Sequence, residues 1–138
     1  MRHFFVFVAL VAVMGLGIGC QNKKGAATAT GLKRVHFDFN SAGIREDMGR
    51  ILDANAGYLK THKDLKVTIE GHCDERGTNE YNLALGDRRV NSVERYLTNK
   101  GVGNNRLKTV SYGEERPTCT KHNETCWWEN RRGDFVAD

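Results

Sequence analysis

Residues 71–89 read GHCDERGTNEYNLALGDRR, and this stretch decides the fold because it joins a strand to a helix. Val67 and Ile69 alternate with polar residues just before it, which predicts a half-buried strand that ends at Gly71. Thr78 has the side chain of a helix N-cap, so a helix is expected to begin directly after it. The stretch therefore predicts a strand, a short loop and a helix in close succession.

The same stretch brings a fixed acid and a fixed base together. Asp74 lies where the predicted strand ends, and Arg89 lies on the helix that follows. A ligand that carries both an ammonium and a carboxylate would meet an oppositely charged partner for each group. This pattern indicates a recognition site that requires no chemistry.

The elements on either side follow from periods of two and of 3.6 residues. Working outward, we expect strands near 35–39, 67–71, 107–112 and 133–137, a helix over 44–59, and a helix whose apolar stripe is Leu83, Val90, Val93 and Leu97. The order β-α-β-α-β with a final β predicts an α+β fold, with helices packed on one face of a small mixed sheet.

The first 19 residues have the pattern of a secretory signal. Arg2 precedes an apolar run over 4–14, which is too short for a bilayer that takes roughly 20 apolar residues. Small residues before Cys20 are similar to the processing site of bacterial lipoproteins, in which that cysteine is diacylated. We therefore expect a lipoprotein signal peptide over 1–19 and lipid on Cys20. Gly17 departs from the leucine usual at that site, and an ordinary cleaved signal with a periplasmic product is the alternative.

Residues 20–31 are expected to be the lipidated cysteine and a flexible tether, because they are small and polar with nothing to bury. Gln21 stands where aspartate would retain a lipoprotein at the inner membrane, which favours the outer membrane. Residues 32–138 then suit one domain with one core.

The charge balance argues against nucleic acid as a partner. Removal of residues 1–19 takes away Arg2 and lowers the formal net charge from +4 to +3. The charges are mixed along the chain, and no basic block is interleaved with aromatic residues. A solvated surface is the expected result.

The cysteines divide by position. In an oxidising compartment, Cys119 and Cys126 are close enough in sequence to close a small loop, and we expect that disulfide. Cys73 is left over and is expected to be a small, half-buried residue at a strand end. The alternative is a nucleophile, or a metal ligand together with His72, His122 and the other thiols. No pattern typical of zinc sites is present, and we expect no metal and no cofactor.

These residues carry a family resemblance. From about 35 to 132 the chain closely resembles the OmpA-like C-terminal domain of the peptidoglycan-associated lipoproteins (Pal). The motifs that match are 71–78 (GHCDERGT), 81–86 (YNLALG), Arg88-Arg89, 100–102 (KGV), 111–114 (SYGE) and 130–132 (NRR).

The resemblance implies a function and a set of partners. It implies non-covalent binding to the peptidoglycan stem peptide through the free end of meso-diaminopimelate, and a role in the Tol-Pal system with TolB and other Tol proteins. Carried over by matching position, Asp74 would take the ammonium and Arg89 the carboxylate, in a two-pronged contact that lysine could not copy. Arg76, Asn82 and Phe39 would line or brace the same pocket.

Three features depart from the family pattern. Asn40 stands where many relatives have aspartate, which removes a charge near the ligand ammonium. Cys73 replaces a common threonine with little change in size. The segment from Cys119 to Trp128 is unlike the usual stretch, and its paired Trp127 and Trp128 would either pack on the sheet edge or form a partner-binding patch.

Two other classes of function can be compared with this sequence. An enzyme is disfavoured, because Asp74 and Glu75 are adjacent and nothing places two carboxyl groups across a bond as glycoside hydrolysis needs. The remaining alternative is a protein-interacting outer-membrane lipoprotein whose pocket mainly serves TolB.

Overall fold

The computed structural model describes residues 31–138, so the expectations for the signal peptide, for Cys20 and for most of the tether lie outside the described residues. In chain order the elements are β1 (Val35–His36), α1 (Glu46–Thr61), β2 (Val67–His72), α2 (Asn79–Asn99), a 3-10 turn (Asn104–Arg106), β3 (Leu107–Gly113), α3 (Glu124–Asn130) and β4 (Arg132–Ala137). Thr78 caps α2 as predicted, its side-chain oxygen accepting a hydrogen bond from the backbone N–H of Tyr81 at 3.2 Å.

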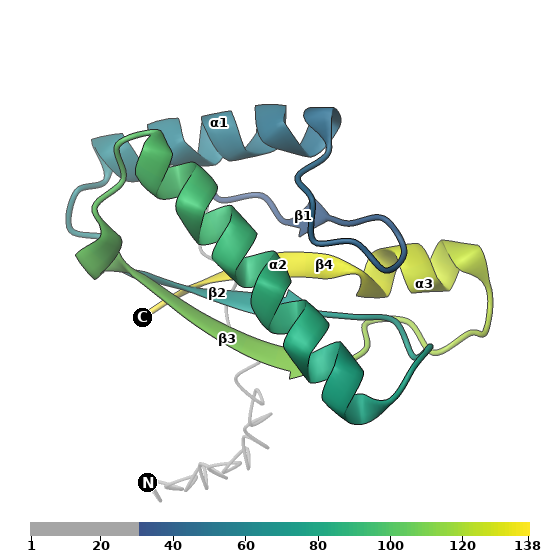
Figure 1. Cartoon of the computed structure of the whole chain (residues 1–138). Coiled ribbons are helices and arrows are strands. Elements are labelled where there is room, and N and C mark those ends of the chain that lie inside the picture. Colours follow the sequence, from purple (N-terminus) through teal and green to yellow (C-terminus); the bar gives the residue numbers. More distant parts are fainter. Residues whose placement is uncertain (1–30) are drawn as a thin grey trace, which may run out of the picture.

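The four strands form one mixed sheet in the order β1-β4-β2-β3. Strand β4 is antiparallel to both β1 and β2, whereas β2 and β3 are parallel and are joined by the crossover helix α2. Helices α1 and α2 lie on the same side of the sheet, with α2 running diagonally across β2 and β3 (Figure 1). The predicted α+β fold with helices on one face of a mixed sheet is confirmed.

The hydrophobic core lies between these helices and the sheet. Its fully buried side chains come from both layers and include Leu52, Leu59, Val90, Val93 and Leu97 on the helices and Val35, Val67, Ile69 and Phe135 on the strands. The core of the described residues falls within 32–135, so this part of the chain buries its own apolar surface.

Two glycines let α2 approach the sheet closely. A Cβ atom at Gly71 would lie 2.4 Å from the carbonyl oxygen of Gly86, and one at Gly86 would lie 2.2 Å from Oγ of Ser111. Neither position can hold a larger side chain without moving the helix. The contact fixes the height of α2 over the sheet and therefore the position of Arg89, which lies one turn further along.

Two expectations about the elements were wrong in part. The first strand ends at His36 and not at residue 39. The chain turns at Asn40, which adopts a left-handed conformation (φ 52°), and Phe39 is exposed. Leu83 is only half-buried, and α2 instead buries Leu85 together with polar or small residues, namely Asn82, Gly86 and Arg89.

Helix α3 was not predicted. It begins after Asn123, whose side chain accepts a hydrogen bond from the backbone N–H of Cys126 at 3.0 Å. The predicted disulfide between Cys119 and Cys126 is confirmed and ties the start of this segment to α3. Trp128 stacks on His36 of the edge strand, with the ring centroids 4.9 Å apart. One of the two tryptophans thus packs on the sheet edge.

A side chain of α1 holds the chain just before β1. Asn55 is buried, and its Oδ1 accepts from the backbone N–H of Lys33 at 3.0 Å while its Nδ2 donates to the carbonyl of Lys33 at 2.7 Å. The amide therefore pairs with this residue as a neighbouring strand would.

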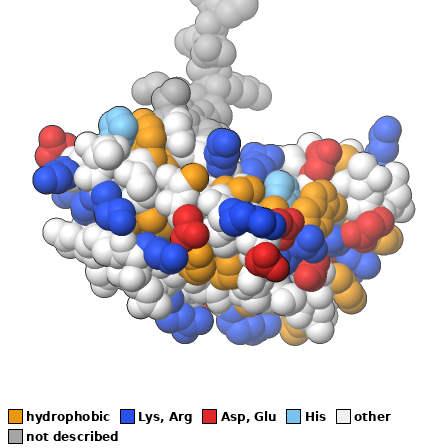
Figure 2. Space-filling model, turned by 90° about the horizontal axis from the view of Figure 1, so that it is seen from above, with side chains coloured by type: hydrophobic (Ala, Val, Ile, Leu, Met, Phe, Trp, Pro, Cys, Tyr) orange, Lys and Arg blue, Asp and Glu red, His pale blue; other side chains and the backbone are white. Residues whose placement is uncertain are grey.

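The surface is polar and mixed in charge. In the view from above, Lys and Arg side chains are scattered among Asp and Glu side chains and apolar groups (Figure 2). Among the helices formed by residues 31–138, none has the length and apolar character needed to cross a membrane.

Candidate functional site

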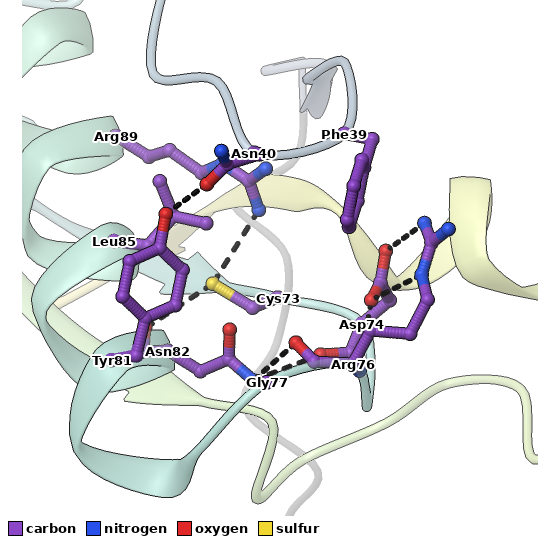
Figure 3. Close-up of a pocket in the computed structure, with 10 residues that line it drawn as sticks. All are labelled: Phe39, Asn40, Cys73, Asp74, Arg76, Gly77, Tyr81, Asn82, Leu85 and Arg89. Atoms are coloured by element: carbon purple, nitrogen blue, oxygen red, sulfur yellow. Dashed lines mark hydrogen bonds and ion pairs between the residues drawn. The ribbon is translucent and has the colours of Figure 1, made fainter.

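A pocket of about 410 Å³ opens where β2 ends and α2 begins. Figure 3 shows the side chains around it, which come from the turn after β1, the loop after β2 and the first three turns of α2. It is lined by Phe39, Asn40, Cys73, Asp74, Arg76, Gly77, Tyr81, Asn82, Leu85 and Arg89. All six predicted ligand-binding residues therefore line one pocket.

Asp74 is buried on one side of this pocket, with 3% of its surface exposed. Its Oδ1 accepts from the backbone N–H of Arg76 at 3.0 Å and from Arg76 Nε at 3.1 Å. Its Oδ2 accepts from Arg76 Nη2 at 2.7 Å and from Arg131 Nη1 at 3.2 Å. The carboxylate thus has two arginine partners within the protein.

These partners decide the ionisation of Asp74. Burial alone raises the pKa of the Asp74 carboxyl, but the hydrogen bonds from Arg76 and Arg131 outweigh it and hold that pKa below its ordinary value. Asp74 is therefore charged at neutral pH in spite of its burial.

Arg89 is fully buried under the other side of the pocket, at 0% exposure. Its Nε donates to the carbonyl of Ser41 at 2.8 Å, its Nη1 to the carbonyl of His72 at 2.9 Å and its Nη2 to the carbonyl of Asp38 at 3.0 Å. A second bond from Nη1 goes to Cys73 Sγ at 3.4 Å, which is a weak acceptor. Burial lowers the pKa of Arg89, but an arginine stays protonated even so.

Arg76 lies between two aromatic rings. Its guanidinium carbon is 3.9 Å from the ring centroid of Phe39 and 4.2 Å from that of Trp127, so Phe39 forms a wall of the pocket through its contact with Arg76. Phe39 is 56% exposed, which is unusual for so large an apolar side chain.

The two asparagines of the site have different tasks. Asn82 is buried and donates to the carbonyls of Asp74 at 3.2 Å and Arg76 at 3.1 Å, so it fixes the loop that carries both charges. Gly77 (φ 104°) allows that loop to turn back toward α2. Asn40 lies at the pocket rim, where its Oδ1 accepts a hydrogen bond from the Tyr81 hydroxyl (Figure 3).

Comparison with known proteins decides the family. The model of the OmpA family matches residues 36–131. A relative named peptidoglycan-associated lipoprotein, from Mesorhizobium japonicum, is 40% identical, and the alignment covers 92% of this chain and 88% of that protein. The chain belongs to the OmpA family, among the peptidoglycan-associated lipoproteins.

Solved structures agree with this membership. The crystal structure of the peptidoglycan-associated lipoprotein from Burkholderia pseudomallei is 42% identical, with a TM-score of 0.74 over 77% of this chain and 90% of that one. The C-terminal domain of Helicobacter pylori MotB shares the fold, with a TM-score of 0.73 at 22% identity. The relatives are named as lipoproteins and not as enzymes, in agreement with the interpretation that this chain is not catalytic.

Cys73 is a packing residue. It is almost fully buried, more so than expected, and its thiol donates to the carbonyl of Asn82 at 3.2 Å. Burial raises the pKa of this thiol, which disfavours the thiolate that a nucleophile or metal ligand needs. Within residues 31–138 no group of three or more His, Cys, Asp or Glu side chains is arranged to hold a metal ion.

The structure adds three residues to this family site that the sequence did not assign to it. Arg131 binds Asp74 from the far end of the domain, Tyr81 binds Asn40 at the rim, and Trp127 covers Arg76. The role of Arg131 could have been inferred from the sequence, because Arg131 and Arg132 belong to the motif at 130–132 that matches the family. The tryptophan lies in the segment that departs from the family pattern, so the motifs gave no indication of its position.

Proposed function

We propose that this chain is an outer-membrane lipoprotein that binds peptidoglycan non-covalently through the diaminopimelate of the stem peptide. It would anchor the outer membrane to the cell wall as part of the Tol-Pal system, which serves envelope integrity and outer-membrane constriction at cell division. The observation that carries the proposal is one pocket with a charged carboxylate, Asp74, and a charged guanidinium, Arg89, on different sides (Figure 3).

The donors of Arg89 support the role given to it. An arginine has five N–H groups, and three of those on Arg89 bond backbone carbonyls. Of the other two, one on Nη1 meets only the weak acceptor Cys73 Sγ, and one on Nη2 has no bond to another residue of 31–138. A ligand carboxylate that reaches Arg89 would take these two in a two-pronged contact. The carbonyls that bind the rest of the guanidinium hold it in place for that contact.

The layout of the chain completes the mechanism. Residues 1–19 would direct export, lipid on Cys20 would fix the chain in the outer membrane with its domain facing the periplasm, and residues 20–31 would span the gap to the domain at 32–138. Linking many such sites to one membrane raises the effective concentration of each. Each contact with the wall can then be weak and exchangeable while the layers stay coupled.

Co-sedimentation with purified diaminopimelate-type sacculi tests the proposal, using the chain from residue 21 onward. We expect the wild type to pellet, and Asp74→Ala and Arg89→Ala to stay in solution after a check that both fold. Asp64→Ala and Arg95→Ala make the same changes at exposed positions outside the pocket and should pellet as the wild type does. A wild type that stays in solution, or charge variants that pellet normally, would contradict wall binding through this pair.

A second function has its own support. Phe39 and Tyr81 are the exposed large hydrophobic side chains of the described residues, and both stand at the pocket mouth. Exposed aromatic residues are typical of protein-binding surfaces. If the pocket mainly serves TolB, the variants Phe39→Ala and Tyr81→Ala should lose TolB binding. Protein-free sacculi should then not retain the wild-type protein.

A further inference from the structure

The carboxylate of Asp74 has no room for another donor. A carboxylate offers about four acceptor positions on its two oxygens, and Asp74 accepts four hydrogen bonds, three from Arg76 and one from Arg131. The ammonium of a ligand can bind Asp74 only if one of these donors leaves.

Arg76 is the side chain that can leave. Its side chain is 31% exposed, whereas that of Arg131 is 3% exposed. Arg131 is also held from other directions, since its Nε donates to the carbonyl of Phe37 at 2.9 Å and its Nη atoms bond the carboxylate of Glu124. If the Arg76 side chain moves away, one acceptor position becomes free on each oxygen of Asp74, which an ammonium with three donors can fill.

A second carboxylate lies ready for the displaced guanidinium. Glu124 Oε2 is 3.9 Å from Arg76 Nη2, and the Glu124 side chain is 65% exposed. A small rotation of Arg76 would exchange Asp74 for Glu124 without leaving the cation unpaired.

The aromatic residues around Arg76 oppose this movement. The guanidinium lies between the rings of Phe39 and Trp127, and each contact favours the position over Asp74. Trp127 is itself fixed, because its Nε1 donates to Glu75 Oε1 at 2.8 Å and because the Cys119–Cys126 disulfide closes the chain at α3.

We propose that Arg76 is an internal plug that occupies the place of the ligand's cationic group on Asp74, and that Trp127 sets how readily this plug is displaced. The inference rests on the proposed function and adds a specificity-determining residue, Trp127, from the segment that departs from the family pattern. The ligand class is a compound with a primary ammonium group, because an ammonium is small enough to reach both freed acceptor positions.

Calorimetric titration of the chain from residue 21 onward with meso-diaminopimelate tests the inference. Arg76→Met removes the competing cation but keeps an apolar side chain of similar length, and we expect it to bind about tenfold tighter than the wild type. Trp127→Ala weakens the hold on Arg76 and is expected to bind about threefold tighter. Arg50→Met removes the same charge from a 74% exposed side chain on α1 and should bind as the wild type does.

The outcomes separate this inference from the proposed function. Binding by the wild type that Arg76→Met weakens or leaves unchanged overturns the plug and leaves diaminopimelate recognition standing. Absence of binding by the wild type and by Arg76→Met alike overturns both. In a Trp128→Phe variant Trp127 is the one tryptophan of the sequence, and its fluorescence must change on addition of meso-diaminopimelate if Arg76 moves away from it. An unchanged signal with saturated ligand contradicts the inference.

Discussion

Two polar side chains near the end of β2 are both buried, yet they differ in almost every other respect. Asp74 accepts four hydrogen bonds from two arginines on the pocket side. His72, two residues earlier, has no hydrogen-bond partner on either ring nitrogen within the described residues, and its nearest carboxylate atoms, on Glu70 and Asp134, are 3.7 and 3.9 Å from Nε2.

The difference shows in the pKa values. Arginine neighbours lower the pKa of Asp74 against the effect of burial and keep it charged. Burial, aided by Arg132, lowers the pKa of His72 to about 4 and keeps it neutral. Burial of a polar group therefore does not by itself indicate a binding site. A site requires a charge whose partner can be exchanged, as Arg76 can be on Asp74.

The largest expected effect is the removal of Asp74. Asp74→Ala leaves Arg131 buried with one partner fewer, and breaking a buried ion pair costs about 3–5 kcal/mol of unfolding free energy. Binding of meso-diaminopimelate should fall more than 100-fold, because the ammonium loses its only buried counter-ion in the pocket.

Urea denaturation and calorimetric titration measure the two effects. Asp74→Asn keeps the shape of the side chain and one oxygen that can accept two hydrogen bonds. It should therefore recover part of the stability but not the binding. Equal affinities for Asp74→Asn and the wild type would show that charge on Asp74 is not what the ligand recognises.

The next effect is a pH dependence of stability that belongs to His72. The unfolded chain takes up a proton near the ordinary pKa of 6.5, whereas the folded protein does so only near 4. The unfolding free energy is therefore not reduced by His72 above about pH 7. It falls as the pH drops from 6.5 to 4, by about 3 kcal/mol at most from this residue. His72→Gln does not titrate and should remove this part of the pH dependence.

Urea denaturation at pH 7, 5.5 and 4 gives the measurement, with His62→Gln, an exposed histidine, as the control. If wild type and His72→Gln lose stability in parallel, the His72 environment differs from that of the structure.

Reduction of the disulfide should loosen the region around Asp74 more than it loosens β2. Loss of the Cys119–Cys126 link is expected to lower the unfolding free energy by about 2–3 kcal/mol in the chain-entropy model. Amide hydrogen exchange should rise in α3, whose Glu124 accepts a hydrogen bond from Arg131, and should rise less in β2. An equal rise of amide exchange in α3 and β2 would show that the surroundings of Asp74 and of His72 do not respond independently.

The smallest effect is expected at the pocket rim. Asn40→Asp adds a negative charge at the rim and keeps an acceptor for the Tyr81 hydroxyl. We expect meso-diaminopimelate to bind about two- to threefold tighter at low salt, with the gain reduced as salt screens the added charge. Titrations at two ionic strengths check this, and weaker binding by Asn40→Asp would contradict it.

Sequence patterns predicted the parts of the molecule that burial controls. Alternation and helical spacing placed β2, β3, β4 and the two long helices, because their apolar faces must meet in one core. The spacing also placed Thr78 as a cap and paired Cys119 with Cys126. For α3, the cap at Asn123 with Glu124 in the first turn was the signal that could have found it.

The contacts that depend on distant segments were not predictable in this way. From local sequence alone, Arg89 would be predicted to be a solvent-exposed helix residue. In the structure it is fully buried, and three backbone carbonyls from two other segments accept its hydrogen bonds. Arg131 meets Asp74 across 57 positions of sequence, and Trp127 meets Arg76 from helix α3, which the Cys119–Cys126 disulfide links to the preceding segment. Pairings of this kind follow from the strand order β1-β4-β2-β3, which local periodicity does not contain.

The amide of Asn55 has a mechanical consequence. It hydrogen-bonds both the backbone N–H and the backbone C=O of Lys33, just before β1. The pocket lies beyond the other end of that strand. A pull on the chain from its N-terminal side loads the buried side chain of Leu32 and this contact before it reaches β1. Tension between that point and a ligand in the pocket then runs along β1, where the ladder bonds to β4 lie across the strand. Such a load shears those bonds together and does not peel them apart one by one.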